Sequence, residues 1–212
     1  MDNDILNEKF GDAIIEGLFP TPVYFSHLKR PLSKEEKKLV AQSKKKTFRN
    51  VGNISSSDTY ILEAKPFKKL KKELLSRVEH FFYNVLCYKD AKPYITQSWL
   101  NYTEPNEHHH GHEHPNSIIS GVFYIDADKE NDSILFKNIN YRQLHINIKN
   151  FNTWNSVSWW YPVETGKLVL FPSYLTHQVT CKKGNNTRIS LAFNVFLKGT
   201  LGTNQELTKL KL

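Results

Sequence analysis

The sequence predicts an α+β fold that is mainly β: a β-sandwich or barrel with N-terminal helices packed on one outer face. Two helical patterns occupy the first part of the chain. From about residue 93 onward, short strand patterns follow one another and are separated by turn signals such as KKGNN. Helices followed by a run of short strands are typical of this class. The helices should therefore cover a sheet that the second part of the chain builds.

Length and composition indicate one domain. The chain has 212 residues, of which 39% are hydrophobic and 24% charged, which is enough for one full core and short for two. It holds no apolar run long enough to span a bilayer, and its acidic N-terminus is unlike a secretory signal, so a cytoplasmic protein is expected. Cys87 and Cys181 are too few for a disulfide framework, and we expect free, partly buried thiols.

Basic residues concentrate in the helical part. The net charge is +8, and 15 of the 29 lysines and arginines lie between Lys29 and Arg77. Such a region could attract nucleic acid or another acidic partner. A charge run on a helix is more often a solvated face, and the aromatic residues here follow helix periodicity. Nucleic-acid binding is therefore possible but not favoured.

The N-terminal elements follow in order. Residues 18–28, LFPTPVYFSHL, predict an edge strand with its prolines near the start. Ser33 and Glu36 form a capping box that begins a helix, which strong helix formers continue to about Lys46. Residues 50–60 are rich in turn formers.

A second helix carries a clear apolar stripe. Pro66 lies near its first turn, and lysines occupy the other side. The stripe recurs at three and four residues and should cover a sheet. Its members are Phe67, Leu70, Leu74, Val78, Phe81 and Val85.

The remaining chain predicts strands. Alternation and β-branched or aromatic content indicate them in seven stretches. The stretches are 95–103, 107–126, 132–136, 144–148, 166–171, 177–181 and 188–196. Residues 199–212 predict a tail or a short closing helix.

The histidine-rich tract EHHHGHEHPNS predicts a metal site at the mouth of a strand. His112 and His114 are two residues apart and share one face of a strand, and Pro115 favours extended geometry at His114. His108, His109 and His110 are interpreted as the loop that leads in. The alternatives are a solvated histidine loop, an adventitious metal binder or a purification tag, and the internal, interrupted position argues against a tag.

A third ligand should come from another strand, and His177 is the candidate. If the turn of the following hairpin is Gly184-Asn185, then His177 faces Ala192 and lies on the same side as Arg188 and Asn194. Arg188 would then lie about 13 Å along the ladder, a gap that suits a small diacid. Its guanidinium could bind a carboxylate in bidentate fashion, or it could only cap the hairpin.

These residues give the sequence a family resemblance. LFPTPVY, SWLNY, HEHPNSIISGVFYID, GKLVLFPSYLTH and RISLAFN resemble the 2OG-Fe(II) oxygenases of bacteria and tailed phages, especially phages of marine bacteria, over about Leu18 to Leu197. The resemblance implies a double-stranded β-helix (a jelly-roll or cupin-like barrel), with His112 and His177 binding Fe(II) and Arg188 holding the distal carboxylate of 2-oxoglutarate. The superfamily pattern is H-x-D followed by a distant His, and here His114 replaces the Asp. The ligand set is then three histidines, or two with water.

The implied reaction is oxidative decarboxylation of 2-oxoglutarate with O₂, coupled to hydroxylation of an unidentified peptide, nucleobase or metabolite. Asn101, Tyr102 and Asn194 are expected to contact the co-substrate or the ligands. The aromatic connection 136–166 is either a substrate cover or core. One domain, 1–212, is expected: an arm (1–17), a helical support (18–92), the β-helix core (93–197) and a tail (198–212). A phage-encoded chain would act in the host cytoplasm.

Two rival functions remain open. The first is a three-histidine, cupin-type dioxygenase that needs no 2-oxoglutarate. A cupin glutamate after the H-x-H is missing, since Ile118 and Ile119 stand there, and Arg188 would have no role. The second is a non-catalytic barrel that binds a metal or a partner through its basic helices.

Overall fold

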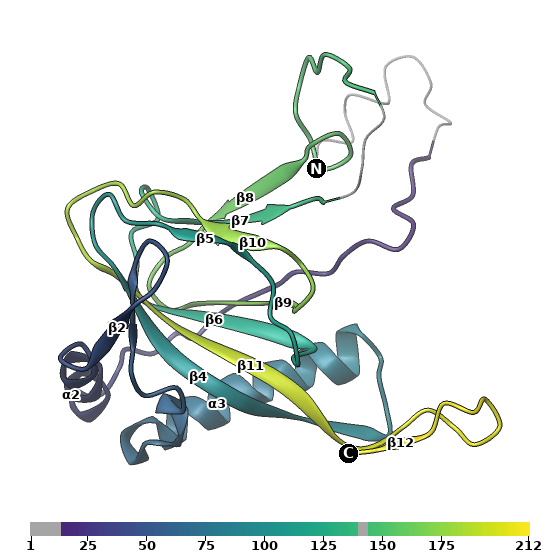
Figure 1. Cartoon of the computed structure of the whole chain (residues 1–212), viewed down its shortest axis with the longest axis horizontal. Helices are drawn as coiled ribbons and strands as arrows, with labels where there is room; N and C mark the ends of the chain where they lie inside the picture. Colours follow the sequence, from purple (N-terminus) through teal and green to yellow (C-terminus); the bar gives the residue numbers. More distant parts are fainter. Residues whose placement is uncertain (1–13, 140–143) are drawn as a thin grey trace.

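The computed structural model describes residues 14–139 and 144–212. Helices, a large antiparallel sheet and a smaller antiparallel sheet lie in three successive layers (Figure 1). The two sheets face each other, and the helices cover the outer face of the larger sheet, as predicted. Most of the predicted N-terminal arm falls outside the described residues. Within them, no helix is long and apolar enough to cross a membrane.

The N-terminal support begins with β1 (Tyr24–His27), which pairs with β9 at the edge of the large sheet. Helix α2 (Lys34–Ser43) then starts with both hydrogen bonds of the predicted Ser33–Glu36 capping box. Arg30 bridges Glu36 and Glu73 at 2.8 Å each, so one guanidinium ties the start of α2 to the second helix.

The region predicted as turn, residues 50–60, contains a strand. Strand β2 (Thr47–Arg49) and strand β3 (Ile54–Ser56) form a hairpin that extends the large sheet beyond β4. The helix predicted to reach Lys46 ends at Ser43 for this reason. Turn formers occupy the hairpin loop, where Gly52 has a φ of 92° that a side chain would strain.

The second helical segment runs through two 3₁₀ turns, η1 (Ile61–Glu63) and η2 (Lys65–Phe67), into α3 (Lys68–His80) and the π-helical turn η3 (Phe81–Val85). The predicted stripe is buried from Phe67 to Phe81 and packs against the large sheet. Val85 is 47% exposed and does not belong to it, because the wider π turn rotates the last residues away.

The large sheet has the strand order β1-β9-β6-β11-β4-β3-β2. Its long members are β4 (Ala91–Thr103), β6 (Ile119–Asp126), β9 (Lys167–Pro172) and β11 (Arg188–Leu201). The predicted C-terminal tail or helix is instead a strand pair, in which β12 (Leu210–Lys211) returns along the end of β11.

The small sheet has the order β5-β10-β7-β8. Its strands are β5 (His109–His112), β10 (His177–Val179), β7 (Ser133–Lys137) and β8 (Ser158–Pro162). The strand predicted at 144–148 is absent, because these residues have no partner strand and most are exposed. The predicted hairpin between His177 and Arg188 is also wrong. Strands β10 and β11 belong to different sheets, and the chain between them crosses the barrel.

The two faces of the large sheet differ in polarity, as the alternation of polar or small and apolar residues along β11 predicts. Leu191, Phe193 and Val195 face the helices and are buried in the outer core. Arg188, Ser190, Ala192 and Asn194 face the small sheet, where a second apolar cluster of Tyr124, Ile134, Phe136, Val163, Val169 and Phe171 fills the barrel. Gly121 lies on the helix-facing side of the sheet with Phe193, since a Cβ there would overlap the Phe193 ring.

Tyr102 lies on the helix-facing side, so its predicted contact with the co-substrate is wrong. Its hydroxyl donates to the Val40 carbonyl of α2 at 2.7 Å, and its side chain is fully buried. Strand side chains alternate, so Asn101 and Tyr102 necessarily face opposite ways. Cys87 and Cys181 are free thiols as predicted, but both are exposed.

Replacing Tyr102 with Phe should lower the free energy of unfolding by about 1 to 2 kcal/mol, because the buried Val40 carbonyl loses its donor. Denaturant unfolding measures this change, and Tyr94→Phe on the same strand is the control. The affinity for 2-oxoglutarate should stay unchanged. A variant with normal stability and weakened 2-oxoglutarate binding would place the hydroxyl in the site after all.

Candidate metal centre

His112 and His177 meet because they are direct partners in the small sheet. His112 ends β5 and His177 begins β10, and the two residues pair across the antiparallel ladder. Directly opposed residues point to the same face, so their rings lie with centroids 4.4 Å apart. His177 is 5% exposed, and the Phe171 ring packs edge-on against it at 4.6 Å. The sequence identified both histidines, although not the pairing that joins them.

His114 completes the cluster from just beyond the strand. Strand β5 ends at His112, so His114 is not a strand residue as predicted, although its ring still stacks on His112 at 5.0 Å. Its backbone N–H donates to the Ser173 carbonyl at 3.0 Å. Its ring lies 5.1 Å from that of His177, so all three rings converge.

Each of these imidazoles has its Nδ1 beside an oxygen of the protein. His112 Nδ1 lies 2.8 Å from the His110 carbonyl, and His177 Nδ1 lies 3.1 Å from the Leu175 carbonyl. A carbonyl only accepts, so each Nδ1 carries the proton and each Nε2 keeps its lone pair. This tautomer is the one that metal-binding histidines with such partners adopt.

The Nδ1 of His114 also lies beside oxygens, and these belong to side chains instead of the backbone. Its Nδ1 lies 2.6 Å from Asn194 Oδ1 and 2.9 Å from Ser120 Oγ. Ser120 Oγ is within 2.9 Å of Ser173 Oγ, which donates to Ser117 Oγ at 2.8 Å. Asn194 was predicted to contact the co-substrate or the ligands, and in the structure its side chain contacts Nδ1 of His114.

The donor set fits a divalent cation. One nitrogen from each of His112, His114 and His177 lies within 4.8 Å of the others. Three neutral imidazoles suit Fe²⁺, Ni²⁺ or Zn²⁺ better than a hard cation such as Mg²⁺. Among residues 14–139 and 144–212, the groups able to hold a metal contain no carboxylate. Glu113 is exposed and hydrogen-bonds to the Thr176 hydroxyl instead.

Burial keeps these histidines neutral. Burial, followed by the neighbouring imidazoles, lowers the pKa of His177 to about 2. The same causes lower the pKa of His114 to about 4, and burial lowers the pKa of His112. The lone pairs are thus available to a cation at neutral pH without competition from protons.

Arg188 lies inside the barrel, at the start of β11, with 3% of its surface exposed. Its Nη1 reaches Asp132 Oδ1 only at 3.4 Å. Lys182, also buried, approaches the same oxygen at 3.4 Å but donates in addition to the Lys183 carbonyl and Asn186 Oδ1. The ammonium is therefore fully used, whereas the guanidinium keeps donors for another acceptor. Burial lowers the pKa of Arg188, yet a guanidinium stays charged.

Tyr124 is a site residue that the sequence reasoning missed. It lies on the inner face of β6, opposite Ser190, and its hydroxyl is buried without a hydrogen-bond partner among the described residues. Burial raises its pKa, and the positive charge of Arg188 is near enough to oppose that rise. Alternation from Ser120 along β6 could have placed it on this face.

Asn101 faces the barrel, where it pairs with Ser190, two residues along from Arg188 and its partner Thr103. Its Oδ1 accepts a hydrogen bond from Ser55 at 2.7 Å, so β3 holds the carboxamide in place. The aromatic connection is largely outside the core where it is described, with Phe151 70% exposed and Trp160 61% exposed.

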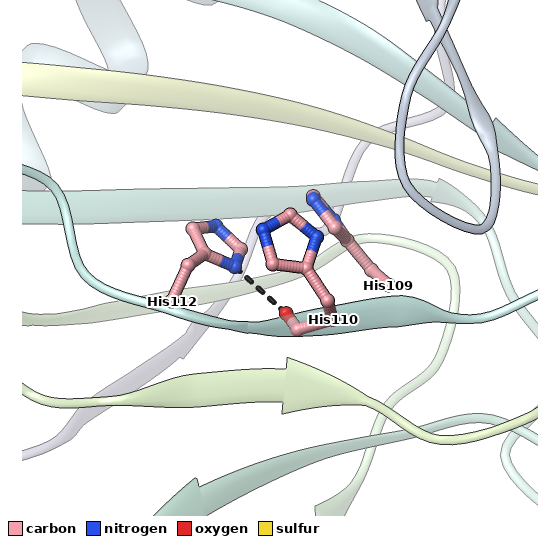
Figure 2. A group of neighbouring side chains, drawn as sticks. All are labelled: His109, His110 and His112. Carbon is pink, nitrogen blue, oxygen red and sulfur yellow. Dashed lines mark hydrogen bonds between the residues drawn. The ribbon is translucent and has the colours of Figure 1, made fainter.

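His109 and His110 are not the loop that the sequence predicted. They are the first residues of β5, and their imidazoles stand beside that of His112 on one side of the strand (Figure 2). Only His108 precedes the strand. The ring centroids of His109 and His112 are 4.5 Å apart.

A largely apolar cavity of about 1150 Å³ opens beside His114. Pro115, Ile118 and Tyr174 line it near the histidine, and Phe82 and Leu86 line it on the helical side. It offers space for a substrate next to the metal ligands.

Stability of the metal-free protein should fall as the pH drops from about 6.5 to about 4.5. In the folded state the pKa values of His114 and His177 lie below the ordinary 6.5, so only the unfolded chain binds protons in this range. Each histidine contributes a slope of about 1.4 kcal/mol per pH unit. Denaturant unfolding with a chelator measures the slope, and His177→Gln should reduce it. A slope that is the same in both proteins would contradict the assigned shift.

Comparison with known proteins agrees with this geometry. Residues 97–194 match the family described as "Putative 2OG-Fe(II) oxygenase". No curated sequence matches the chain. Among solved structures, an oxidoreductase of the 2OG-Fe(II) oxygenase family from Burkholderia pseudomallei is 13% identical, with 81% of this chain and 83% of that chain covered and a TM-score of 0.53.

Two further structures are similar. HygX from Streptomyces hygroscopicus, with nickel and 2-oxoglutarate bound, is 11% identical over 82% of each chain with a TM-score of 0.55. A prolyl-4-hydroxylase from Pseudomonas putida is 12% identical, with 82% of this chain and 92% of that chain covered and a TM-score of 0.52. The fold is the double-stranded β-helix of these proteins. Its core, residues 97–194, which carries His112, His114 and His177, is the part that matches the 2OG-Fe(II) oxygenase family.

Proposed function

We propose that the protein is an Fe(II)- and 2-oxoglutarate-dependent dioxygenase in which His112, His114 and His177 hold the metal. The observation that carries this proposal is the arrangement of the three rings, since every Nδ1 has an oxygen partner and one nitrogen of each ring lies within 4.8 Å of the others. The helical support and the β-helix core act as one catalytic domain.

Arg188 and Tyr124 form the anchor for the distal carboxylate of 2-oxoglutarate. Both groups are buried between the sheets: the Tyr124 hydroxyl has no hydrogen-bond partner among the described residues, and the Arg188 guanidinium reaches Asp132 only at 3.4 Å. A buried guanidinium beside an unpartnered hydroxyl is costly unless an anion fills the space. A carboxylate would accept from both and so remove the cost. Asp132 also contacts the guanidinium of Arg188, with its Oδ1 3.4 Å from Nη1.

Bound Fe(II) would supply the oxidation, with O₂ and 2-oxoglutarate giving succinate, CO₂ and a hydroxylated product. The protein residues orient the ligands and keep water out. Hydrogen bonds at Nδ1 fix the planes of the three rings. Phe171 packs on His177, and the Trp99 ring lies 5.8 Å from that of His114, so apolar walls flank the metal position.

Histidine in place of the usual aspartate changes the charge of the site. Three neutral imidazoles leave the full charge of Fe(II) uncompensated, whereas a carboxylate would cancel half of it. When the dianion 2-oxoglutarate binds, one of its carboxylates would offset half of this charge and the other would offset the charge of Arg188. Metal and co-substrate should therefore bind with strong positive coupling, since each relieves the cost of burying the other's charge.

The substrate would approach through the cavity beside His114. Its apolar lining favours a substrate with an apolar part, and peptides, nucleobases and small metabolites remain candidates. The three-histidine dioxygenase without a co-substrate is the rival. It would give the buried Arg188 and Tyr124 no ligand.

Anaerobic addition of Fe(II) and 2-oxoglutarate should produce the weak visible charge-transfer band of the bound chelate, and iron-loaded protein in air should convert 2-oxoglutarate slowly to succinate. His112→Ala and His177→Ala should each lose the band, because two imidazoles hold the cation poorly. His145→Ala, an exposed histidine elsewhere, is the control. A band unchanged in the ligand variants would show that the assigned ligands are wrong. Absence of both the band and succinate would favour the rival.

The anchor can be tested separately from the metal. Tyr124→Phe should weaken 2-oxoglutarate binding about 10-fold, and Arg188→Met about 100-fold, from the loss of one and of two hydrogen bonds to a charged group. Tyr124→Phe should not lower the stability of the ligand-free protein, because its hydroxyl has no partner to lose. Lys182→Met is the control, expected to lose stability but keep its affinity in calorimetric titration. Equal losses of affinity for Lys182→Met and Arg188→Met would refute the assignment of the anchor.

A further inference from the structure

We propose a second divalent-cation site, formed by His109, His110 and His112, that shares His112 with the catalytic set and is the position through which the metal is loaded. We refer to these three residues as the outer set, and to His112, His114 and His177 as the inner set. The role of the inner set rests on the proposed function. The outer set stands on its own geometry.

A β-bulge creates the outer set. His177 pairs with His112, and Val179 pairs with His109, so two steps along β10 correspond to three along β5. The extra residue breaks the alternation of side chains, and bulges re-aim side chains next to active sites. Three imidazoles consequently stand on one side of β5, as Figure 2 shows.

The outer set is as compact as the inner set. Its ring centroids are 4.5, 4.9 and 5.2 Å apart, against 4.4, 5.0 and 5.1 Å for the inner set. One nitrogen of each outer histidine lies within 4.8 Å of the others. A geometry that suits a cation in one set therefore suits it in the other, and imidazole donors select the same borderline metals.

One nitrogen of the outer set also lacks a partner. His110 Nδ1 is buried and has no hydrogen-bond partner among residues 14–139 and 144–212. His109 Nε2 lies 3.1 Å from the side-chain amide nitrogen of Asn50, whose oxygen accepts from the Val51 N–H. The amide is thus a donor to His109, and a cation bound through Nε2 would take its place. A buried lone pair without a partner is costly, and a cation removes that cost.

The shared histidine makes the two positions exclusive. His112 Nδ1 is committed to the His110 carbonyl, so only Nε2 can bind a metal. One lone pair serves one cation at a time. A metal held by the outer set can therefore reach the inner set without leaving His112, by exchanging His109 and His110 for His114 and His177.

The surroundings set the direction of this transfer. The hairpin loop between β2 and β3 lies over the outer set, with Asn50 at His109 and the Gly52 carbonyl accepting from the His108 N–H at 3.0 Å. Within the inner set, His177 lies deepest, since it is 5% exposed and packs against Phe171, whereas His109, His110 and His112 are half-buried. A cation that first binds the outer set would therefore reach His177 last.

The test begins with a full-length chain carrying His114→Ala and His177→Ala, which leaves the outer set intact. Calorimetric titration with Co²⁺ should show one ion per chain, and anomalous diffraction at the cobalt edge should place it among His109, His110 and His112. Adding His109→Phe and His110→Phe keeps a ring at each position and should abolish binding. Adding His145→Ala instead should leave it unchanged. No binding in the first variant, or equal binding after the phenylalanine changes, would overturn the proposal.

Exclusivity and loading are tested in the chain with an intact inner set. It should bind one Co²⁺ and not two, and two ions per chain would contradict a shared His112. His109→Phe with His110→Phe should slow Co²⁺ uptake several-fold in stopped-flow absorbance, and an unchanged rate would refute the loading role. The 2-oxoglutarate charge-transfer band of the unmodified protein reports on the inner set independently, so a failure of the outer site is distinguishable from a failure of the proposed function.

Discussion

The inner histidines can share one cation because the Nδ1–H of each donates a hydrogen bond to an oxygen of the protein, which leaves the Nε2 lone pair for the metal. For His112 and His177 these oxygens are carbonyls two residues earlier in the same chain segment, so the strand itself sets the tautomer. His114 has left the strand and depends on Asn194, which comes from the opposite sheet. The site therefore exists only when the two sheets face each other, and the packing of the barrel and the chemistry of the metal are one requirement.

Charge explains why the anchor is arranged as it is. Among the described residues, the barrel buries Arg188 and Lys182 with a single carboxylate, Asp132, between them. Lys182 is satisfied by a carbonyl and an amide, so the excess positive charge resides on Arg188. The three-histidine set adds a dication without adding a ligand anion. A dianionic co-substrate that spans both positions would bring one negative charge to each, and this gives the replacement of aspartate by His114 a consequence beyond its effect on iron.

The sequence predicted those features that depend on local periodicity. The capping box at Ser33, the buried stripe of α3 and the polar inner face of β11 all follow from spacing along one strand or helix. The pairing of strands does not. His177 and Arg188 were placed in one hairpin because only eight residues separate β10 from β11, yet that connection crosses between sheets. Tyr124 was missed because no spacing within β6 shows that Arg188 lies beside it. Tyr102 was assigned to the site together with Asn101, although adjacent residues of a strand point to opposite faces of the sheet.

The histidine tract shows most clearly what periodicity can and cannot determine. Alternation grouped His112 with His114, whereas His109 and His110 were interpreted as the loop that leads in; strict alternation would in any case separate His109 from His112, which differs from it by three residues. This separation of His109 from His112 holds only where the two strands pair residue for residue. The bulge opposite β10 removes one step and brings His109 back beside His112. A single inserted residue is invisible in the pattern of one strand, because it is defined only against its partner. By adding His109 to His110 and His112, which alternation already places on one face, the bulge gives the strand three potential ligands and places His112 in two possible ligand sets.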